Sequence, residues 1–107
     1  MATLIGTSAF EIEGAGGIRG MADLHRRLLA VLRTSSVVTI GLAGVTDPDV
    51  TLIQLIEAAR HYAATNGIGL RLRSPAKGEL RRQLERGGFV SRPVDRDYWF
   101  GCGEARQ

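Results

Sequence analysis

Apolar and polar residues follow two different periods in the first half of the chain. Phe10–Glu13 alternates apolar with acidic residues, which predicts a short strand, and Leu4-Ile5 predicts another short strand. From Met21 to about Arg33, apolar residues recur at helical spacing on one stripe, which predicts an amphipathic helix. Val37–Leu42 is short, mostly apolar and β-branched, as expected for a strand covered on one or both faces.

Helical spacing returns in the second half of the chain and predicts a helix over residues 49–64. Asn66-Gly67 ends this helix, because both residues tolerate the left-handed backbone conformation. The alternating segment Ile68–Arg73 predicts a strand. Ser74-Pro75 then predicts a helix start, with serine as the cap and proline at the first helical position, and this helix runs to about Arg86.

The chain beyond this helix carries fewer signals. Gly87-Gly88 ends the helix, and Phe89-Val90 predicts a short strand that returns to the core. Residues 91–107 are expected to form a C-terminal tail. In this tail, Tyr98-Trp99-Phe100 predicts either an edge strand or a hydrophobic latch, and whether Trp99 belongs to the core or to an interface stays open.

The order of these elements predicts the fold class. Strand, strand, helix, strand, helix, strand, helix and short strand indicate an α/β domain with right-handed crossovers between parallel neighbours. We expect a mixed, mostly parallel sheet of four or five strands with the helices packed mainly on one face. The chain of 107 residues has the size of one domain, with its core at about residues 4–90.

A glycine-rich segment at residues 14–20 has the composition of a phosphate-binding loop but not its pattern. It lacks the Gly-Lys-Ser/Thr ending, and Arg19 stands where the dinucleotide fingerprint requires its third glycine. The segment is therefore interpreted as a connector.

Residues capable of catalysis or metal binding are few. Cys102 is the single cysteine, and the two histidines, His25 and His61, have neither a cysteine nor a second histidine at ligand spacing. We therefore expect no disulfide, no metal, no cofactor and no enzymatic activity. No apolar run approaches the roughly 18 residues that a membrane span needs. The N-terminal residues also lack the pattern of a signal peptide, so a cytoplasmic protein without membrane insertion is expected.

The formal net charge is +3, and basic residues gather at positions 71–86. This segment contains Arg71, Arg73, Lys77, Arg81, Arg82 and Arg86. One interpretation is a face that contacts phosphates of a nucleotide or nucleic acid, or an acidic partner. We favour a solvated helix face neutralised by pairs such as Arg81–Glu85, because no aromatic residues are interleaved.

The segment from Gly44 to Leu52 joins the end of a predicted central strand to the start of a helix. In open α/β sheets, ligands and partners bind at such junctions. Asp47 or Asp49 can cap the helix, and a carboxylate also suits the positive end of the helix dipole. Capping alone and a role in recognition both remain open for these aspartates.

This segment also resembles a known family. Asp49–Ile56, preceded by Gly44-Val45 and the Val37–Leu42 strand, is similar to the central signature of STAS domains, which sulfate transporters and bacterial anti-sigma factor antagonists share. In that signature, a small-Gly-Val turn leads to Asp-Ser/Thr-Ser/Ala-Gly/Ala-Leu at a helix start. The similarity extends over most of the chain, through Asp23-Leu24, Leu28-Leu29, Gly67, Leu70-Arg71-Leu72, Ser74-Pro75, Leu80, Leu84 and Gly88-Phe89.

The resemblance implies a non-enzymatic regulatory module. In antagonist members, a partner kinase phosphorylates the serine or threonine after the aspartate, and the added charge blocks binding. Here that position is Val50, and Thr51 follows it on a different side of the helix. The acidic residue that many members place in the central strand falls at Gly41, and Pro48 stands where an apolar residue usually precedes the aspartate. We therefore expect constitutive binding or regulation elsewhere, with Thr51 as the remaining candidate for phosphorylation.

The resulting hypothesis is docking on an anti-sigma factor kinase or a histidine kinase through loop 46–51 and the exposed face of the following helix. The candidate contacts are Thr46, Asp47, Asp49, Val50, Thr51, Gln54 and Glu57, together with His61. One alternative is a cytoplasmic STAS subunit of a lipid-transporting ABC system, which would contact the ATPase. A second alternative is a nucleotide- or nucleic-acid-binding module that uses residues 71–86. The sequence leaves a homodimer open.

Overall fold

The computed structural model describes residues 7–15 and 20–101, in which strands and helices alternate along the chain. The elements are β1 (Thr7–Ala15), α1 (Met21–Arg33), β2 (Val37–Asp47), α2 (Val50–Asn66), β3 (Gly69–Leu72), α3 (Gly78–Arg86) and α4 (Pro93–Phe100). Leu4-Ile5, Cys102 and most of the glycine-rich connector lie outside the described residues.

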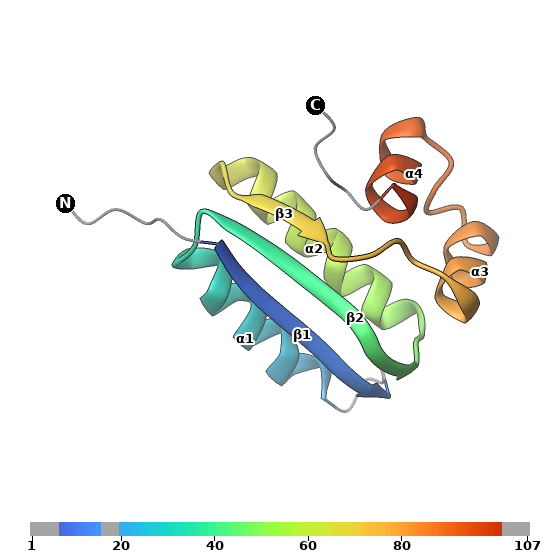
Figure 1. Ribbon diagram of the computed structural model, residues 1–107, viewed down its shortest axis with the longest axis horizontal. Coiled ribbons are helices and arrows are strands. Elements are labelled where there is room, and N and C mark those ends of the chain that lie inside the picture. Colours follow the sequence, from blue (N-terminus) through green and yellow to red (C-terminus); the bar gives the residue numbers. More distant parts are fainter. Residues whose placement is uncertain (1–6, 16–19, 102–107) are drawn as a thin grey trace.

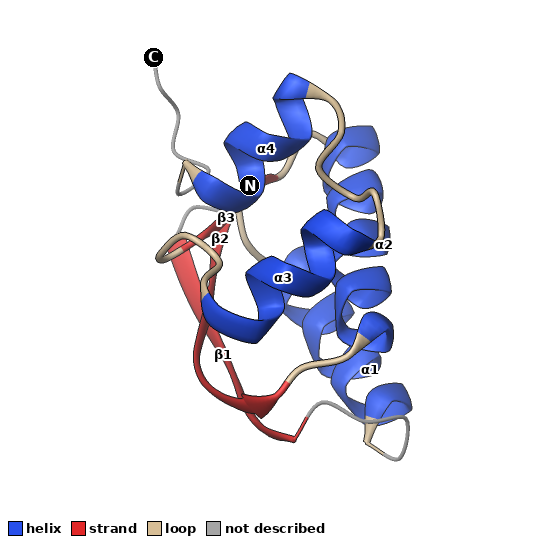
Figure 2. Cartoon of the chain, turned by 90° about the vertical axis from the view of Figure 1, so that its right-hand side faces the viewer, coloured by secondary structure: helices blue, strands red, loops and turns tan. Residues whose placement is uncertain are grey.

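The sheet has the strand order β1-β2-β3, with β2 in the centre and both pairings parallel. Thr7 lies opposite Val37, and Val37 lies opposite Gly69. Helices α1 and α2 cover one face, whereas α3 and α4 lie beyond the edge strand β3 (Figure 1, Figure 2). The expected α/β class is thus confirmed, with helices mainly on one face. In the described part of the chain the sheet has three strands, fewer than the four or five expected, and none is antiparallel.

Near the C-terminus, the predicted strand at Phe89-Val90 is absent, and of the two alternatives for Tyr98-Trp99-Phe100 the edge strand is wrong. Phe89-Val90 forms a turn after Gly88, whose φ of +78° suits glycine, and Val90 reaches the core from this turn. Tyr98-Trp99-Phe100 belongs to α4. The side chain of Trp99 is fully buried. This segment therefore packs into the core as the predicted hydrophobic latch and does not form the edge strand.

The predicted start of α3 at Ser74-Pro75 is also wrong. The helix begins at Gly78, with Lys77 as its N-cap residue. The backbone N–H of Ala76 donates to the carbonyl of Trp99 at 2.8 Å, and the Ala76 side chain is buried. This hydrogen bond holds the segment before Gly78 against α4, outside the helix.

The core lies between the sheet and helices α1 and α2. Alternation along each strand sends one set of side chains into this layer. The strands contribute Phe10, Ile12, Val38, Ile40 and Leu72, and the two helices contribute Leu28, Leu32, Leu52, Ile53, Leu55, Ile56, Ala59 and Ala63. The core therefore fixes the first half of β2 against α2, and the exposed end of β2 leads into the loop between them.

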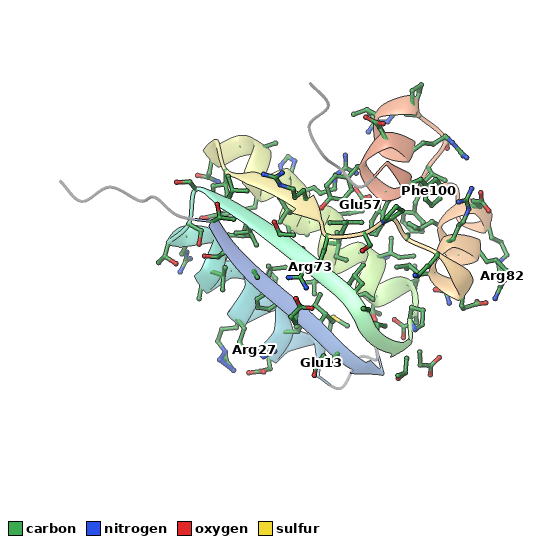
Figure 3. The ribbon with its side chains drawn as sticks, viewed as in Figure 1. Glu13, Arg27, Glu57, Arg73, Arg82 and Phe100 are labelled. Atoms are coloured by element: carbon green, nitrogen blue, oxygen red, sulfur yellow. The ribbon has the colours of Figure 1, made fainter. Side chains whose placement is uncertain are left out.

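On the opposite face of the sheet, a salt bridge crosses the central strand. Glu11 of β1 pairs with Arg73, which follows β3 and reaches over the sheet (Figure 3). The Glu11 side chain lies over Gly41 of β2, where any Cβ would collide with it. A carboxylate therefore lies above the position where STAS domains often carry an acidic residue, but it comes from the neighbouring strand.

Helix α4 is attached to α2 by polar contacts around Trp99. The indole Nε1 donates to Glu57 Oε2 of α2 at 2.8 Å. Asp95 of α4 accepts from Arg60 of α2 at 3.1 Å and from Arg92 at 2.9 Å. The hydrogen bond from Arg92, helped by that from Arg60, holds the pKa of Asp95 below its usual value although burial opposes this. These contacts fix α4 beside α2.

Candidate functional site

The junction between β2 and α2 is organised by Asp49. This residue is the N-cap of α2, and its Oδ1 accepts a hydrogen bond from the backbone N–H of Thr51 at 3.0 Å. The Thr51 hydroxyl donates to the same oxygen. Asp49 therefore satisfies donors at the helix start, so the capping interpretation has direct geometric support. Asp47 is exposed at the last position of β2.

Val50 and Thr51 have opposite surroundings. Val50 is the first residue of α2 and its surface is 46% exposed, one of two large apolar side chains that are exposed among the described residues. Thr51 is half-buried, and its hydroxyl is held by Asp49. The position of the usual phosphoacceptor is thus an exposed apolar group, while the remaining hydroxyl is bonded to the Asp49 carboxylate.

Helix α3 holds this loop from the side. Gln83 donates through Nε2 to the carbonyl of Pro48 at 2.8 Å and to Glu79 at 3.2 Å. The hydrogen bonds from Gln83 and Arg82 keep the pKa of Glu79 below its usual value. The sequence carries no signal for the Gln83 contact, because Gln83 and Pro48 are 35 positions apart. The loop is therefore anchored both by its own cap and by a neighbouring helix.

A groove of about 270 Å³ lies beside the loop. One wall comes from the end of β2 and the loop, and the other comes from the segment between β3 and α3 and the first turn of α3. The lining includes Leu42, Val45, Thr46, Pro48, Pro75 and Leu80. Mostly apolar side chains thus form a concave surface at the carboxyl end of the parallel strands, where α/β sheets commonly bind ligands and partners.

The predicted contact residues on α2 differ in their availability. Gln54 and His61 are exposed, as are Thr46 and Asp47 in the loop. Glu57 is half-buried and is engaged by Trp99 and Arg60. The structure therefore gives Glu57 a role in holding α4.

Most of the basic residues at positions 71–86 have acidic neighbours. Arg82 and Arg86 pair with Glu79 at 3.0 and 3.5 Å, and Arg81 pairs with Glu85 at 3.5 Å, as expected. Arg73 pairs with Glu11. This pairing supports the interpretation of a solvated, largely neutralised face.

The described ranges hold neither a metal-binding cluster nor a helix suited to crossing a membrane. No group of three or more His, Cys, Asp and Glu residues in residues 7–15 and 20–101 is placed to hold a metal ion. None of the helices described combines the length and the apolar character that crossing a membrane requires.

No protein-family model matches this chain, and no curated protein matches it. Among solved structures, it is similar to the STAS domain of a SulP transporter from Vibrio cholerae, with a TM-score of 0.56 and 21% sequence identity. The match covers 79% of this chain and 66% of that chain, so this chain spans just under two thirds of its length. At this identity the likeness establishes the fold: the chain has a STAS-like fold, as its sequence predicts.

Proposed function

We propose that this STAS-like chain is a non-catalytic protein-binding module of the anti-sigma factor antagonist type. It docks on a signalling partner, an anti-sigma factor kinase or a histidine kinase in the cytoplasm. The docking surface consists of loop 46–51, the adjacent groove and the exposed face of α2 with Gln54 and His61. Asp49 shapes this surface as the cap of α2, and Glu57 holds α4 against α2.

The observation that carries the proposal is the exposure of Val50. An exposed apolar residue at the first position of a helix, two positions after Pro48 of the mostly apolar groove, gains free energy when a partner covers it. Asp49 and Gln83 hold the loop in place before binding. Binding to a preorganised loop costs less conformational entropy than ordering a mobile one.

The surroundings of Thr51 favour constitutive binding. Phosphorylation would break its hydrogen bond to Asp49 and place close to two negative charges beside that carboxylate. Val50, at the usual phosphoacceptor position, has no hydroxyl. We therefore place any regulation of the module outside this helix start. A stoichiometric phosphate on Thr51 in protein from the native host would contradict this part of the proposal.

A second candidate function is favoured by one observation, the likeness to the STAS domain of a SulP transporter. In this alternative, the same surface binds a component of a membrane transport system, such as the ATPase of a lipid-transporting ABC system. The two candidates predict different partners on one surface, so identification of the partner separates them.

The test compares two exposed valines. Val50→Lys places a charge in the proposed interface, and Val94→Lys makes the same change at a 58% exposed position on α4. Both tagged variants and the wild type are purified from the native host, and the partners are quantified by mass spectrometry. Asp49→Lys is a poorer probe than the sequence suggests, because it also removes the cap of α2.

We expect a partner that is retained by Val94→Lys and depleted at least tenfold by Val50→Lys, as expected for a contact near the centre of an interface. A kinase or anti-sigma factor in this role supports signalling, whereas an ATPase with membrane subunits supports the transporter alternative. Equal recovery of every partner by both variants would contradict the proposed surface.

A further inference from the structure

In the described part of the chain, the outer edge of β3 carries no further strand, and α4 lies beside part of it. On its inner side, the N–H groups of Gly69 and Arg73 donate to the carbonyls of Ser36 and Ile40, at 2.9 and 2.8 Å. Because backbone groups alternate along a strand, the N–H and C=O of the intervening Leu70 point away from β2. In the described part of the chain, no strand lies on that outer side.

A second groove, of about 390 Å³, runs along this edge between β3, α2 and α4. Its apolar lining consists of Ala63 and Ala64 from α2 together with Ile68 and Leu70. Tyr98 of α4 also lines it. This groove shares none of its lining residues with the groove beside loop 46–51. An extended segment that paired with Leu70 would place alternate side chains against this apolar lining.

The rim of this groove favours a negative charge. Its two carboxylates, on Glu57 and Asp95, are already bound by arginines. The Arg92 side chain is 74% exposed and directs only Nε and Nη2 toward Asp95, which leaves further guanidinium donors for another acceptor. His61 is exposed on the same rim. A carboxylate on the added segment would meet these donors.

Tyr98 adds a further unused donor. Its hydroxyl is buried and has no hydrogen-bond partner among the described residues. Burial raises the pKa of this hydroxyl, so it stays protonated and can donate. A buried donor without an acceptor is costly.

The other edge of the sheet, on β1, is protected. Glu11 and Glu13 are exposed along this strand, and its pairing with β2 is interrupted by two register shifts. Exposed charges and bulges are the features by which native edge strands avoid pairing with other chains. The two edges therefore differ, and β3 is the edge suited to binding.

We propose that the outer edge of β3 binds an extended, acidic segment of a partner protein as an added strand. The backbone of the segment pairs with Leu70, an apolar side chain enters the groove, and a glutamate or aspartate contacts Arg92 and His61. This surface is separate from loop 46–51, but it shares His61 with the docking surface proposed above, and Glu57 lines its groove.

The probe is a fluorescein-labelled six-residue peptide of alternating valine and threonine with one central glutamate. Two further peptides carry N-methyl groups on alternate backbone nitrogens, one on the odd and one on the even positions, and a fourth replaces glutamate with lysine. Because only one edge of the added strand faces β3, we expect one methylated peptide to bind about tenfold more weakly and the other to bind like the parent. The lysine peptide should also lose about tenfold in affinity.

Variants and amide NMR locate the binding site on the protein. Binding should shift the amide signal of Leu70 and slow its hydrogen exchange. Arg92→Ala should weaken binding about threefold. Arg82→Ala, whose side chain points outward from α3 (Figure 3), and Val50→Lys should leave it unchanged. The proposal is overturned if the Leu70 signal is unmoved at millimolar peptide, if the shifts map to β1 or to loop 46–51, or if both methylated peptides bind like the parent.

Discussion

Replacing Glu57 with alanine should loosen the attachment of α4 to the rest of the domain. The carboxylate accepts the indole N–H of Trp99 at 2.8 Å and also pairs with Arg60 at 3.1 Å. The Trp99 side chain is fully buried, so removal of the carboxylate leaves its N–H without its protein acceptor. Arg60 keeps its second partner, Asp95.

The magnitude follows from these contacts. A hydrogen bond to a charged acceptor contributes about 1.5–3 kcal/mol, and the ion pair with Arg60 adds little because both side chains are partly exposed. We expect Glu57→Ala to lower the free energy of unfolding by about 2 kcal/mol, which corresponds to a Tm lower by about 10 °C for a domain of this size. Glu57→Gln keeps an acceptor oxygen for the indole and should cost about 1 kcal/mol or less.

The assay is urea unfolding followed by circular dichroism and by fluorescence. Trp99 is the single tryptophan of the chain, so its emission reports directly on the docking of α4. Gln54→Ala is the matched control, because Gln54 is exposed on the same helix and should change stability by less than about 0.5 kcal/mol.

An unfolding free energy of Glu57→Ala within about 0.5 kcal/mol of the wild type would refute this reasoning. The same variant also matters for binding studies. A loss of partner binding in Glu57→Ala has to be compared with its loss of stability before Glu57 is counted as a contact residue.

Three further predictions concern single positions. Asp49→Ala should destabilise the fold by about 1 kcal/mol and Asp49→Asn by only a few tenths, because asparagine is an equally good N-cap; chemical denaturation of both variants measures this. Gly67→Ala should cost about 1 kcal/mol because Gly67 has a φ of +70°, whereas Gly67→Asn should cost less in the same assay, because asparagine tolerates this left-handed conformation better. Because Arg92 lowers the pKa of folded Asp95, the stability from this carboxylate is complete above its unfolded value of 3.8 and is lost as pH falls below it; denaturation at several pH values should therefore show a weaker acid dependence for Asp95→Asn than for the wild type.

Each of these predictions has a result that contradicts it. Equal stabilities of Asp49→Ala and Asp49→Asn would mean that the cap contributes nothing. A Gly67→Ala variant as stable as the wild type would contradict the backbone argument. Identical acid profiles for Asp95→Asn and the wild type would show that the carboxylate gains no net stability from its arginines.

Elements governed by local chemistry are predictable from the sequence. Helix α1 occupies the expected residues, and α2 begins after Asp49 and ends before Gly67, because both caps of α2 are satisfied within a few positions along the chain. Strand β2 continues past the predicted end at Leu42 to Asp47. Pairing with β1 keeps that part extended, although its exposed residues no longer show a strand pattern.

Elements governed by contacts between distant residues are less predictable. The start of α3 depends on the Ala76–Trp99 hydrogen bond, which no local pattern indicates. For α4 the sequence does carry a signal, because Pro93 stands at the first helical position and Asp95 in the first turn. The aromatic run that ends this segment favours a strand and masks that signal.

The candidate site shows the same division. The exposure of Val50 and the cap formed by Asp49 follow from their place at a helix start. The support from Gln83, the engagement of Glu57 by Trp99 and the open edge of β3 each depend on how distant elements pack. Sequence patterns therefore locate the loop but not the surfaces around it.

The parallel sheet also determines how this chain can fold. Neither strand pair can form from a tight hairpin, because Thr7 pairs with Val37 and Val37 pairs with Gly69, so each pairing closes a loop of about 30 residues. Such non-local pairing slows folding, and we expect α1 and α2 to form first and to bring the strands together. During synthesis, a nascent chain would have no strand partner for β1 until β2 had left the ribosome. Helix α4, which needs both α2 and the segment after β3, would dock last.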